Sequence, residues 1–158
     1  MVLVRATVMA DWQALRDIRL LALQDAPDAF ASTYAGESAL STAEWRQRAT
    51  RDGSFIAVLP EGSPAGLAGG YQAAPGTVEL IAMFVRPQAR GRGVGAALID
   101  AVVGWAQQKN ATSVHLWVTE TNKHALRLYE RCGFTPTPER QPLPSNPSLS
   151  ELGMIHPL

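Results

Sequence analysis

Two kinds of hydrophobic periodicity alternate along the chain. In the first fifty residues, apolar positions recur every three or four residues, which is the spacing of a helix with one buried face. This spacing predicts a helix that starts at Asp11 and ends before Pro27, and a second helix from Ser41 to Arg51. The segment from Val2 to Val8 has the pattern of a short strand. The N-terminal third is therefore expected to be mostly helical.

From residue 54 the apolar positions alternate or run together, and turns rich in Gly and Pro separate the runs, which is typical of strands. Strands are predicted over 54–59, 65–72, 77–86, 112–118 and 151–157, with a further strand start at 134–135, and helices over 93–109 and 123–132. Residues 136–147 contain five prolines and are predicted to form a loop. This order predicts an α/β (α+β) fold, with one mixed sheet and helices on both faces, in a single domain over residues 1–158.

Composition excludes several classes of protein. The 158 residues are 46% hydrophobic and 18% charged, which fits one globular domain. Fourteen basic and fourteen acidic residues cancel, so no overall attraction to nucleic acid or anionic lipid is expected. No run approaches the roughly 20 apolar residues of a membrane span, and the N-terminus lacks the pattern of a secretion signal. The lone Cys132 suits a reducing compartment, so a cytoplasmic location is expected. The three histidines lack metal-ligand spacing, so no metal is expected.

A glycine-rich turn follows the strongest predicted strand and opens a long apolar helix. It consists of Arg90, Gly91, Arg92, Gly93, Val94 and Gly95. Glycines let the backbone approach a ligand closely, and a helix start offers unpaired N–H groups and the positive end of the dipole. With the two arginines, these features predict a site for a phosphate or pyrophosphate. The alternative is a plain strand–helix turn with solvated arginines.

Two other phosphate-binding loops were compared with this turn. A Walker loop needs Gly-Lys-Ser/Thr, which the chain lacks here. A dinucleotide fingerprint needs a third glycine at position 98, where the chain has Leu98. Binding of ATP or NAD is therefore not predicted.

Two motifs resemble the GNAT superfamily of acetyl-CoA-dependent acetyltransferases. The turn from Arg90 to Gly95 matches the signature Arg/Gln-x-x-Gly-x-Gly/Ala, and the segment from Asn122 to Phe134 is similar to the hallmark Asn-x-x-Ala-x-x-Leu-Tyr-x-x-x-Gly-Phe. The resemblance covers roughly residues 77–137 and implies a mixed, mostly antiparallel sheet. It also implies an N-acetyltransferase that moves an acetyl group from acetyl-CoA to a primary amine, in a small molecule or at a peptide N-terminus, by direct attack in a ternary complex. The alternative is a non-catalytic module that binds acyl-CoA as a sensor or partner subunit.

The resemblance also assigns catalytic roles. Aligning the glycine turns puts Glu79 where some family members carry a glutamate base, which often acts through water. Residues 79, 81, 83 and 85 of a strand share one face, so Glu79 is expected on the face of Met83 and Val85, where the family places the thioester. Tyr129 is the candidate acid for the departing thiolate. The alternatives are a solvated glutamate and a core tyrosine, and Cys132 is expected in the core.

The expected cofactor-binding residues lie on the strand, the turn and the second motif. They are Met83, Phe84, Val85, Arg90, Gly91, Arg92, Gly93, Val94, Gly95, Ala96 and Asn122. The resemblance implies that the backbone of residues 83–85 pairs with the pantetheine amides as an added strand would.

The resemblance places the acceptor between the first helices and the last strands. The expected acceptor-binding residues are Phe30, Tyr34, Glu37 and Glu120, whose two carboxylates could attract a cationic amine. The sequence leaves open the identity of the amine, the length of the acyl donor and the oligomeric state. Dimers are frequent in the family, so the resemblance makes a homodimer possible.

Overall fold

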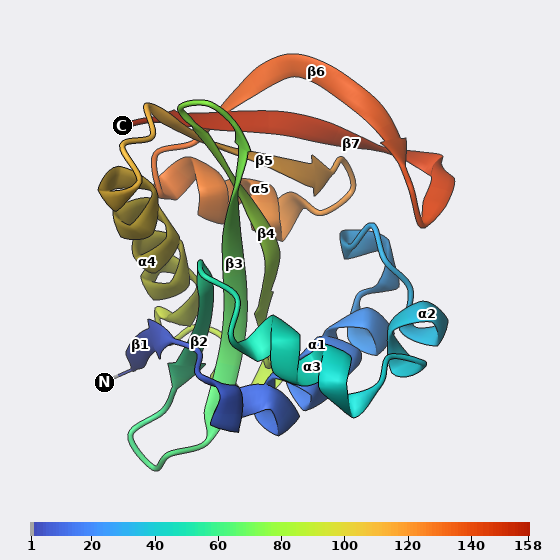
Figure 1. Cartoon of the computed structure of the whole chain (residues 1–158). Helices are drawn as coiled ribbons and strands as arrows, with labels where there is room; N and C mark the ends of the chain where they lie inside the picture. The colour runs from blue at the N-terminus through green and yellow to red at the C-terminus, as the bar shows by residue number, and fades with distance from the viewer. Residues whose placement is uncertain (1) are drawn as a thin grey trace.

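The computed structural model describes residues 2–158, in which three α-helices follow the first strand and two more α-helices lie between the later strands (Figure 1). In these residues the strands are β1 (Leu3–Ala6), β2 (Ser54–Val58), β3 (Pro64–Ala74), β4 (Thr77–Val85), β5 (Ser113–Thr119), β6 (Thr135–Leu143) and β7 (Asn146–Pro157). The α-helices are α1 (Trp12–Asp25), α2 (Tyr34–Ser38), α3 (Thr42–Ala49), α4 (Val94–Gln108) and α5 (Lys123–Arg131).

All the strands join one mixed sheet in the order β1-β2-β3-β4-β5-β7-β6. Neighbouring strands run antiparallel except for β4 and β5, which are parallel. This parallel pair is short, because only Thr77–Glu79 pairs with residues 113–115. Beyond Glu79 the two strands separate, and the sheet is split at its centre.

Helices cover both faces of the sheet, as predicted. Side chains from α1 and α3 pack on one face with Ile56 and Leu67, and side chains from α4 and α5 pack on the other with Ala57 and Ala68. Adjacent residues of β2 and β3 thus enter opposite cores, which is the alternation of a strand buried on both sides. We call these two sides the α1 face and the α4 face.

Strand β4 changes faces at a bulge. Ala82 has a positive φ of 57°, and the pairing with β3 shifts by one residue between Leu67 and Gly69. Before the bulge Val78 and Leu80 lie in the α4-face core, whereas after it Met83 packs there. The expectation that Glu79, Met83 and Val85 share a face is therefore wrong: Glu79 lies on the α1 face, and Met83 and Val85 lie on the α4 face.

The predicted loop over residues 136–147 is also wrong. These residues form β6 and the start of β7, and the long hairpin bends across the end of the sheet (Figure 1). Strand β6 is an edge strand that pairs with β7 only, with a register shift between Pro136 and Arg140. Prolines are tolerated at such an edge because their missing N–H groups leave no partner strand unpaired. At the hairpin tip, Ser145 Oγ donates to Phe30 O at 2.5 Å.

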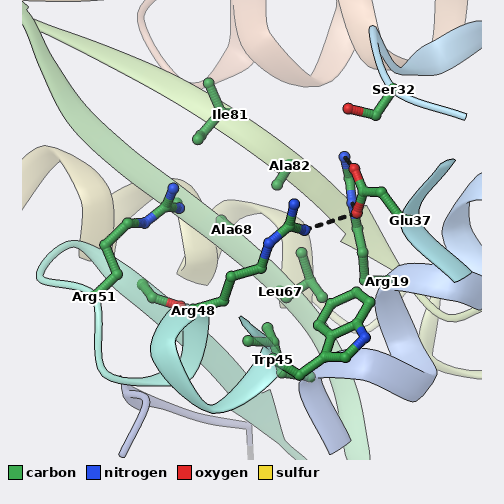
Figure 2. Close-up of a pocket in the computed structure, with 13 residues that line it drawn as sticks. Arg19, Ser32, Glu37, Trp45, Arg48, Arg51, Leu67, Ala68, Ile81 and Ala82 are labelled. Atoms are coloured by element: carbon green, nitrogen blue, oxygen red, sulfur yellow. Dashed lines mark hydrogen bonds and ion pairs between the residues drawn. The ribbon is translucent and has the colours of Figure 1, made fainter. Parts of the chain in front are cut away.

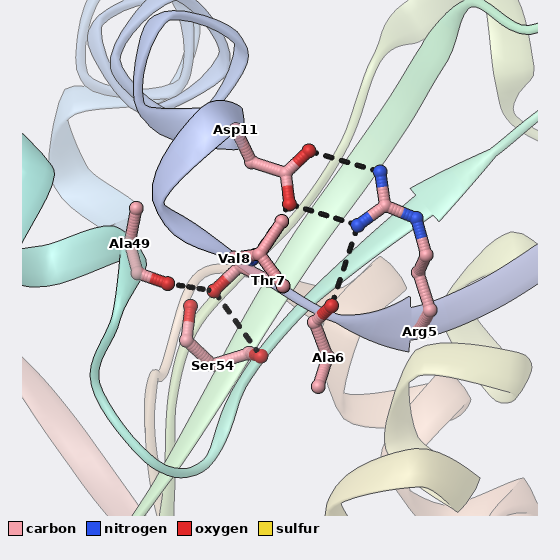
Figure 3. Close-up of polar contacts among 7 residues, drawn as sticks. All are labelled: Arg5, Ala6, Thr7, Val8, Asp11, Ala49 and Ser54. Carbon is pink, nitrogen blue, oxygen red and sulfur yellow. Dashed lines mark hydrogen bonds and ion pairs between the residues drawn. The ribbon is translucent and has the colours of Figure 1, made fainter.

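A buried polar contact fixes the end of α3 to the first strand (Figure 3). Thr7 Oγ1 donates to Ala49 O at 2.7 Å, and the Thr7 backbone N–H donates to Ser54 O at 2.9 Å. Beside it, Arg5 makes two hydrogen bonds to Asp11, at 2.8 and 2.9 Å. Thr7 thus bonds a carbonyl on each side of the turn from α3 into β2, and this turn carries Arg51.

Candidate functional site

A cleft of about 780 Å³ opens where β4 and β5 separate. Its walls are the end of β4, the start of α4, the end of β5, one side of α5 and the segment from Asp25 to Phe30 at the end of α1. Twelve of the predicted site residues line it: Phe30, Met83, Phe84, Val85, Arg90, Gly91, Gly93, Val94, Gly95, Ala96, Asn122 and Tyr129. The split sheet therefore gathers the strand, the turn and the second motif around one space.

The glycine-rich turn has the backbone of an anion site. Gly91 and Gly93 have positive φ angles of 76° and 78°, and no atom lies within 4 Å of where a Cβ would stand on either. Gly93 precedes α4 and supplies no side-chain cap, and Ala97 N is the first amide to reach a helix acceptor, Gly93 O at 3.1 Å. The N–H groups of residues 94–96 are left free for an anion at the cleft, with the positive end of the helix dipole behind them.

The two arginines of the turn differ in their contacts. Arg90 Nη2 lies 3.1 Å from Asp25 Oδ2, and Arg90 Nε donates to Val85 O at 3.2 Å. Its guanidinium also stacks 5.7 Å from the centre of the Phe84 ring. Arg90 therefore ties the turn to α1 and β4. Arg92 is exposed, lies outside the cleft lining and has no ion-pair partner within residues 2–158.

Tyr129 lies in the wall of the cleft and is only 8% exposed. Burial, and then the nearby Cys132, raise the pKa of Tyr129 well above its ordinary value of 10. Its ring packs edge-on against Phe134 at 5.9 Å. Tyr129 is thus a phenol that stays protonated at neutral pH beside the cleft.

The second motif also supplies side chains that sequence reasoning missed. Arg131, His124 and Cys132 line the cleft from α5. They occupy the variable positions of the hallmark, so the motif gave no signal for them. Asn122 has the predicted capping role, because its Oδ1 accepts from Ala125 N at 3.2 Å at the start of α5.

Glu79 does not line the cleft. It lies on the α1 face opposite Tyr71 of β3, whose hydroxyl donates to Glu79 Oε2 at 2.7 Å. This hydrogen bond, with burial and the charge of Glu79, raises the pKa of Tyr71 to about 12. The Tyr71 hydroxyl thus holds the Glu79 carboxylate in place.

A second pocket, of about 250 Å³, lies on the α1 face (Figure 2). Three arginines and Glu37 line it, together with Trp45 and strand residues of β3 and β4. Arg19 makes two hydrogen bonds to Glu37, at 3.0 and 3.1 Å, and Arg48 makes one at 2.8 Å. Burial raises the pKa of the Glu37 carboxyl, but these arginines outweigh it and bring that pKa to about 2.

The two pockets approach each other at the bulge of β4. Ile81 and Ala82 line the smaller pocket, and Met83 and Phe84 line the larger cleft. Because Phe30 and Phe84 belong to the α1-face core and also line the larger cleft, this cleft reaches through the split sheet to the side of the smaller pocket.

The expected acceptor residues are scattered. Phe30 lines the larger cleft and Glu37 the smaller pocket. Tyr34 and Glu120 line neither pocket. Tyr34 is 40% exposed at the start of α2, and Glu120 Oε2 accepts a hydrogen bond from Arg140 Nη1 at 3.2 Å. Within residues 2–158, no three His, Cys, Asp or Glu side chains gather as metal ligands do, and no helix is long and apolar enough to cross a membrane.

Known proteins share both the sequence pattern and the architecture. The family model described as "Acetyltransferase (GNAT) family" matches residues 12–134. An uncharacterized N-acetyltransferase of Methanocaldococcus jannaschii is 43% identical over 56 residues, which are 35% of this chain but only 25% of that relative's own length.

Solved structures extend the similarity to the whole chain. A GCN5-related N-acetyltransferase from Kribbella flavida has a TM-score of 0.81 at 26% identity, covering 99% of this chain and 98% of that one. A phosphinothricin acetyltransferase from Sinorhizobium meliloti, solved in complex with acetyl-CoA, has a TM-score of 0.82 at 20% identity, covering 99% and 88%. At 20% identity, the similarity to this second structure shows a shared fold only.

Proposed function

Because the chain belongs to the GNAT acetyltransferase family, we propose that residues 1–158 act as one domain that transfers an acetyl group from acetyl-CoA to a primary amine. The observation that carries the proposal is the split between β4 and β5, whose open end meets the free N–H groups of α4. A split sheet edge and an anion site in one cleft suit a long ligand with amides and a pyrophosphate.

The chemistry of the cleft suits acetyl-CoA. Residues 94–96 would hold the pyrophosphate with backbone N–H groups, and the unpaired edge of β4 at residues 83–85 would bind the pantetheine amides. The missing side chains at Gly91 and Gly93 leave the approach open. When bound, acetyl-CoA supplies the thioester whose acetyl group is transferred.

The chain's own residues would move two protons. Glu79, held by the Tyr71 hydroxyl at 2.7 Å, is the proposed base that takes a proton from the acceptor ammonium, directly or through water. Tyr129, protonated at neutral pH, is the proposed acid that gives a proton to the departing sulfur. The larger cleft is lined by Phe30 and Phe84 of the α1-face core as well as by Met83 of the α4 face, so it reaches through the split sheet toward the smaller pocket, which supports direct transfer in a ternary complex.

Release of coenzyme A thiol, measured across a panel of small amines and peptides, tests this proposal. We expect Glu79→Gln to lower kcat by about 100-fold or more, and Tyr129→Phe by about 10- to 100-fold, because each removes one proton transfer. Glu61→Gln is the matched control, since Glu61 is exposed in the turn before β3 and hydrogen-bonds only Ser63.

Two outcomes would contradict the proposal in different ways. Unchanged rates in both variants would remove the catalytic assignment but leave the transferase. Calorimetric binding of acetyl-CoA without thiol release on any acceptor would instead favour a non-catalytic acyl-CoA-binding module.

A further inference from the structure

The smaller pocket has a strong excess of positive charge. Arg19, Arg48 and Arg51 line it, and Glu37 is its sole acidic lining residue. Glu37 is already shared by Arg19 and Arg48. The lining therefore keeps a net charge of about +2 at neutral pH, because arginine does not lose its proton in proteins.

Arg51 is the arginine with no partner. Within residues 2–158 no carboxylate lies within ion-pair distance of its guanidinium. Desolvation in the pocket, and then the charges of Arg48 and Arg19, lower the pKa of Arg51 below its ordinary value. Arg51 as a whole is exposed and the Arg48 side chain is 40% exposed, so water screens part of the repulsion among the three guanidinium groups, and a bound anion would relieve the rest.

A glycine of the sheet makes room for Arg51. A Cβ on Gly69 would stand 2.9 Å from Arg51 Nη2, closer than such atoms approach. The guanidinium therefore lies against the bare backbone of β3, opposite Ile81 of β4. Figure 2 shows Arg48 and Arg51 extending from α3 and the turn after it toward these strands.

A second guanidinium in the pocket has an unused donor. Arg19 Nη1 is buried and has no hydrogen-bond partner, although Nε and Nη2 of the same side chain bind Glu37. A buried, charged N–H without an acceptor is costly, and an acceptor atom from a ligand would satisfy it.

The pocket lies next to the proposed base. Tyr71 and Glu79 form the cross-strand pair two residues along from Gly69 and Ile81, on the same face of the sheet. Along the strands, the backbone position of Glu79 thus lies two residues, about 7 Å, from that of Ile81, and the Arg51 guanidinium lies beside Gly69, the partner of Ile81. This arrangement is complementary to a small molecule that carries both an amine and an anionic group.

We propose that the acceptor is a small amine with an acidic group, either a carboxylate or a phosphate-type anion, and that Arg51 binds this group with the help of Arg48 and Arg19. That the ligand carries an amine rests on the proposed acetyl transfer. That it carries an anionic group does not. It separates amino acids and similar compounds from polyamines, neutral amines and peptide N-termini, which have no anion near the amine.

Binding tests the anion subsite without any turnover. Isothermal calorimetry would measure the binding of the twenty L-amino acids, their carboxamides and the matching aminoalkylphosphonates to the protein saturated with coenzyme A. We expect some acids to bind and their carboxamides to bind about 10- to 100-fold more weakly, because charged hydrogen bonds to arginine are lost. A preference for phosphonates over carboxylates would identify the phosphate-type anion as the recognised group.

Variants of the pocket connect this selectivity to Arg51. Arg51→Met keeps an unbranched apolar side chain but removes the guanidinium and its charge, and Gly69→Ala keeps the charge but shifts the flexible end of Arg51. Arg51→Met should weaken binding of the acid about 10- to 100-fold and leave the carboxamide unchanged, Gly69→Ala should weaken binding of the acid by a smaller factor, and Arg51→Lys should restore part of the loss of Arg51→Met. Arg46→Met is the matched control, because Arg46 lies exposed on α3, stacks 5.4 Å from the Trp12 ring and lies outside the pocket.

The outcomes separate this inference from the proposed function. If neutral amines or peptides are acetylated as fast as acids, and Arg51→Met changes neither, the anion subsite is wrong and the transferase stands. If no amine is acetylated but acids bind in an Arg51-dependent way, the transferase is wrong and the anion subsite stands. Equal binding of acids and carboxamides to the wild-type protein would overturn the inference directly.

Discussion

Glu37 should make the stability of the protein strongly dependent on pH. Glu37 is 6% exposed, and its carboxylate is held by Arg19 and Arg48, which bring its pKa from the ordinary 4.5 to about 2. A group whose pKa is lower in the folded than in the unfolded state stabilises the fold above its unfolded pKa. This contribution is lost as the pH falls from about 4.5 toward 2.

The size of the effect follows from the two pKa values. A fall from 4.5 to about 2 corresponds to about 3 kcal/mol of unfolding free energy, at about 1.4 kcal/mol per pKa unit. The Arg48 side chain is 40% exposed, so water screens part of its attraction. We therefore expect Glu37→Gln to lower the free energy of unfolding at pH 7 by about 2 kcal/mol.

Urea denaturation at a series of pH values from 7 to 3 measures this prediction. The gap between the wild-type protein and Glu37→Gln should stay constant above about pH 5 and shrink steadily below pH 4.5, because only the wild-type carboxylate takes up a proton. Glu61→Gln, at an exposed site, should show no such gap. Parallel curves for the wild-type protein and Glu37→Gln down to pH 3 would refute the reasoning, since the ion pairs would then contribute nothing that depends on the charge.

Two further predictions concern the glycine-rich turn and the buried threonine. Gly93→Ala should lower the free energy of unfolding by about 1 kcal/mol, because Gly93 has a φ of 78°. The same change should weaken coenzyme A binding, measured by calorimetry, by about 10-fold or more. Gly104→Ala within α4 is the control, which should leave binding unchanged and slightly raise stability. Equal affinities for Gly93→Ala and the wild-type protein would count against the anion site. Thr7→Val should lower the free energy of unfolding in urea by about 1–2 kcal/mol, because Ala49 O loses its buried donor at 2.7 Å. Thr50→Val, which removes the exposed hydrogen bond from Thr50 Oγ1 to Gln47 O, should cost less than about 0.5 kcal/mol. Equal losses for the two threonines would show that burial of the bond does not matter.

The sequence predicted most of the elements because their signals are local. The helix that begins at Trp12 and the helix that begins at Val94 both show a continuous apolar face, and the structure confirms both. The five prolines of residues 136–147 misled the prediction, because proline argues against a central strand but not against an edge strand. Whether a strand lies at an edge depends on the order of the sheet, which no local pattern contains.

The arginine pocket could not be predicted for a similar reason. Arg19 comes from α1, Glu37 from α2, and Arg48 and Arg51 from α3 and the turn after it. Each of these residues looks like an ordinary solvated charge within its own segment. Only the packing of the three helices on the α1 face shows that Glu37 is neutralised by arginines rather than open to a cationic amine.

The bulge at Ala82 explains why simple strand alternation failed for Glu79. Alanine has no preference for a positive φ, so nothing in the sequence marks the position as irregular. The extra residue nevertheless moves Met83 and Val85 to the α4 face and leaves Glu79 and Ile81 on the α1 face. A regular strand would put Glu79, Met83 and Val85 on one side. With the bulge, the proposed base and the arginine pocket lie on the α1 face, whereas the larger cleft takes Met83 from the α4 face and Phe84 from the α1 face, so the cleft and the pocket approach each other where the strand changes faces.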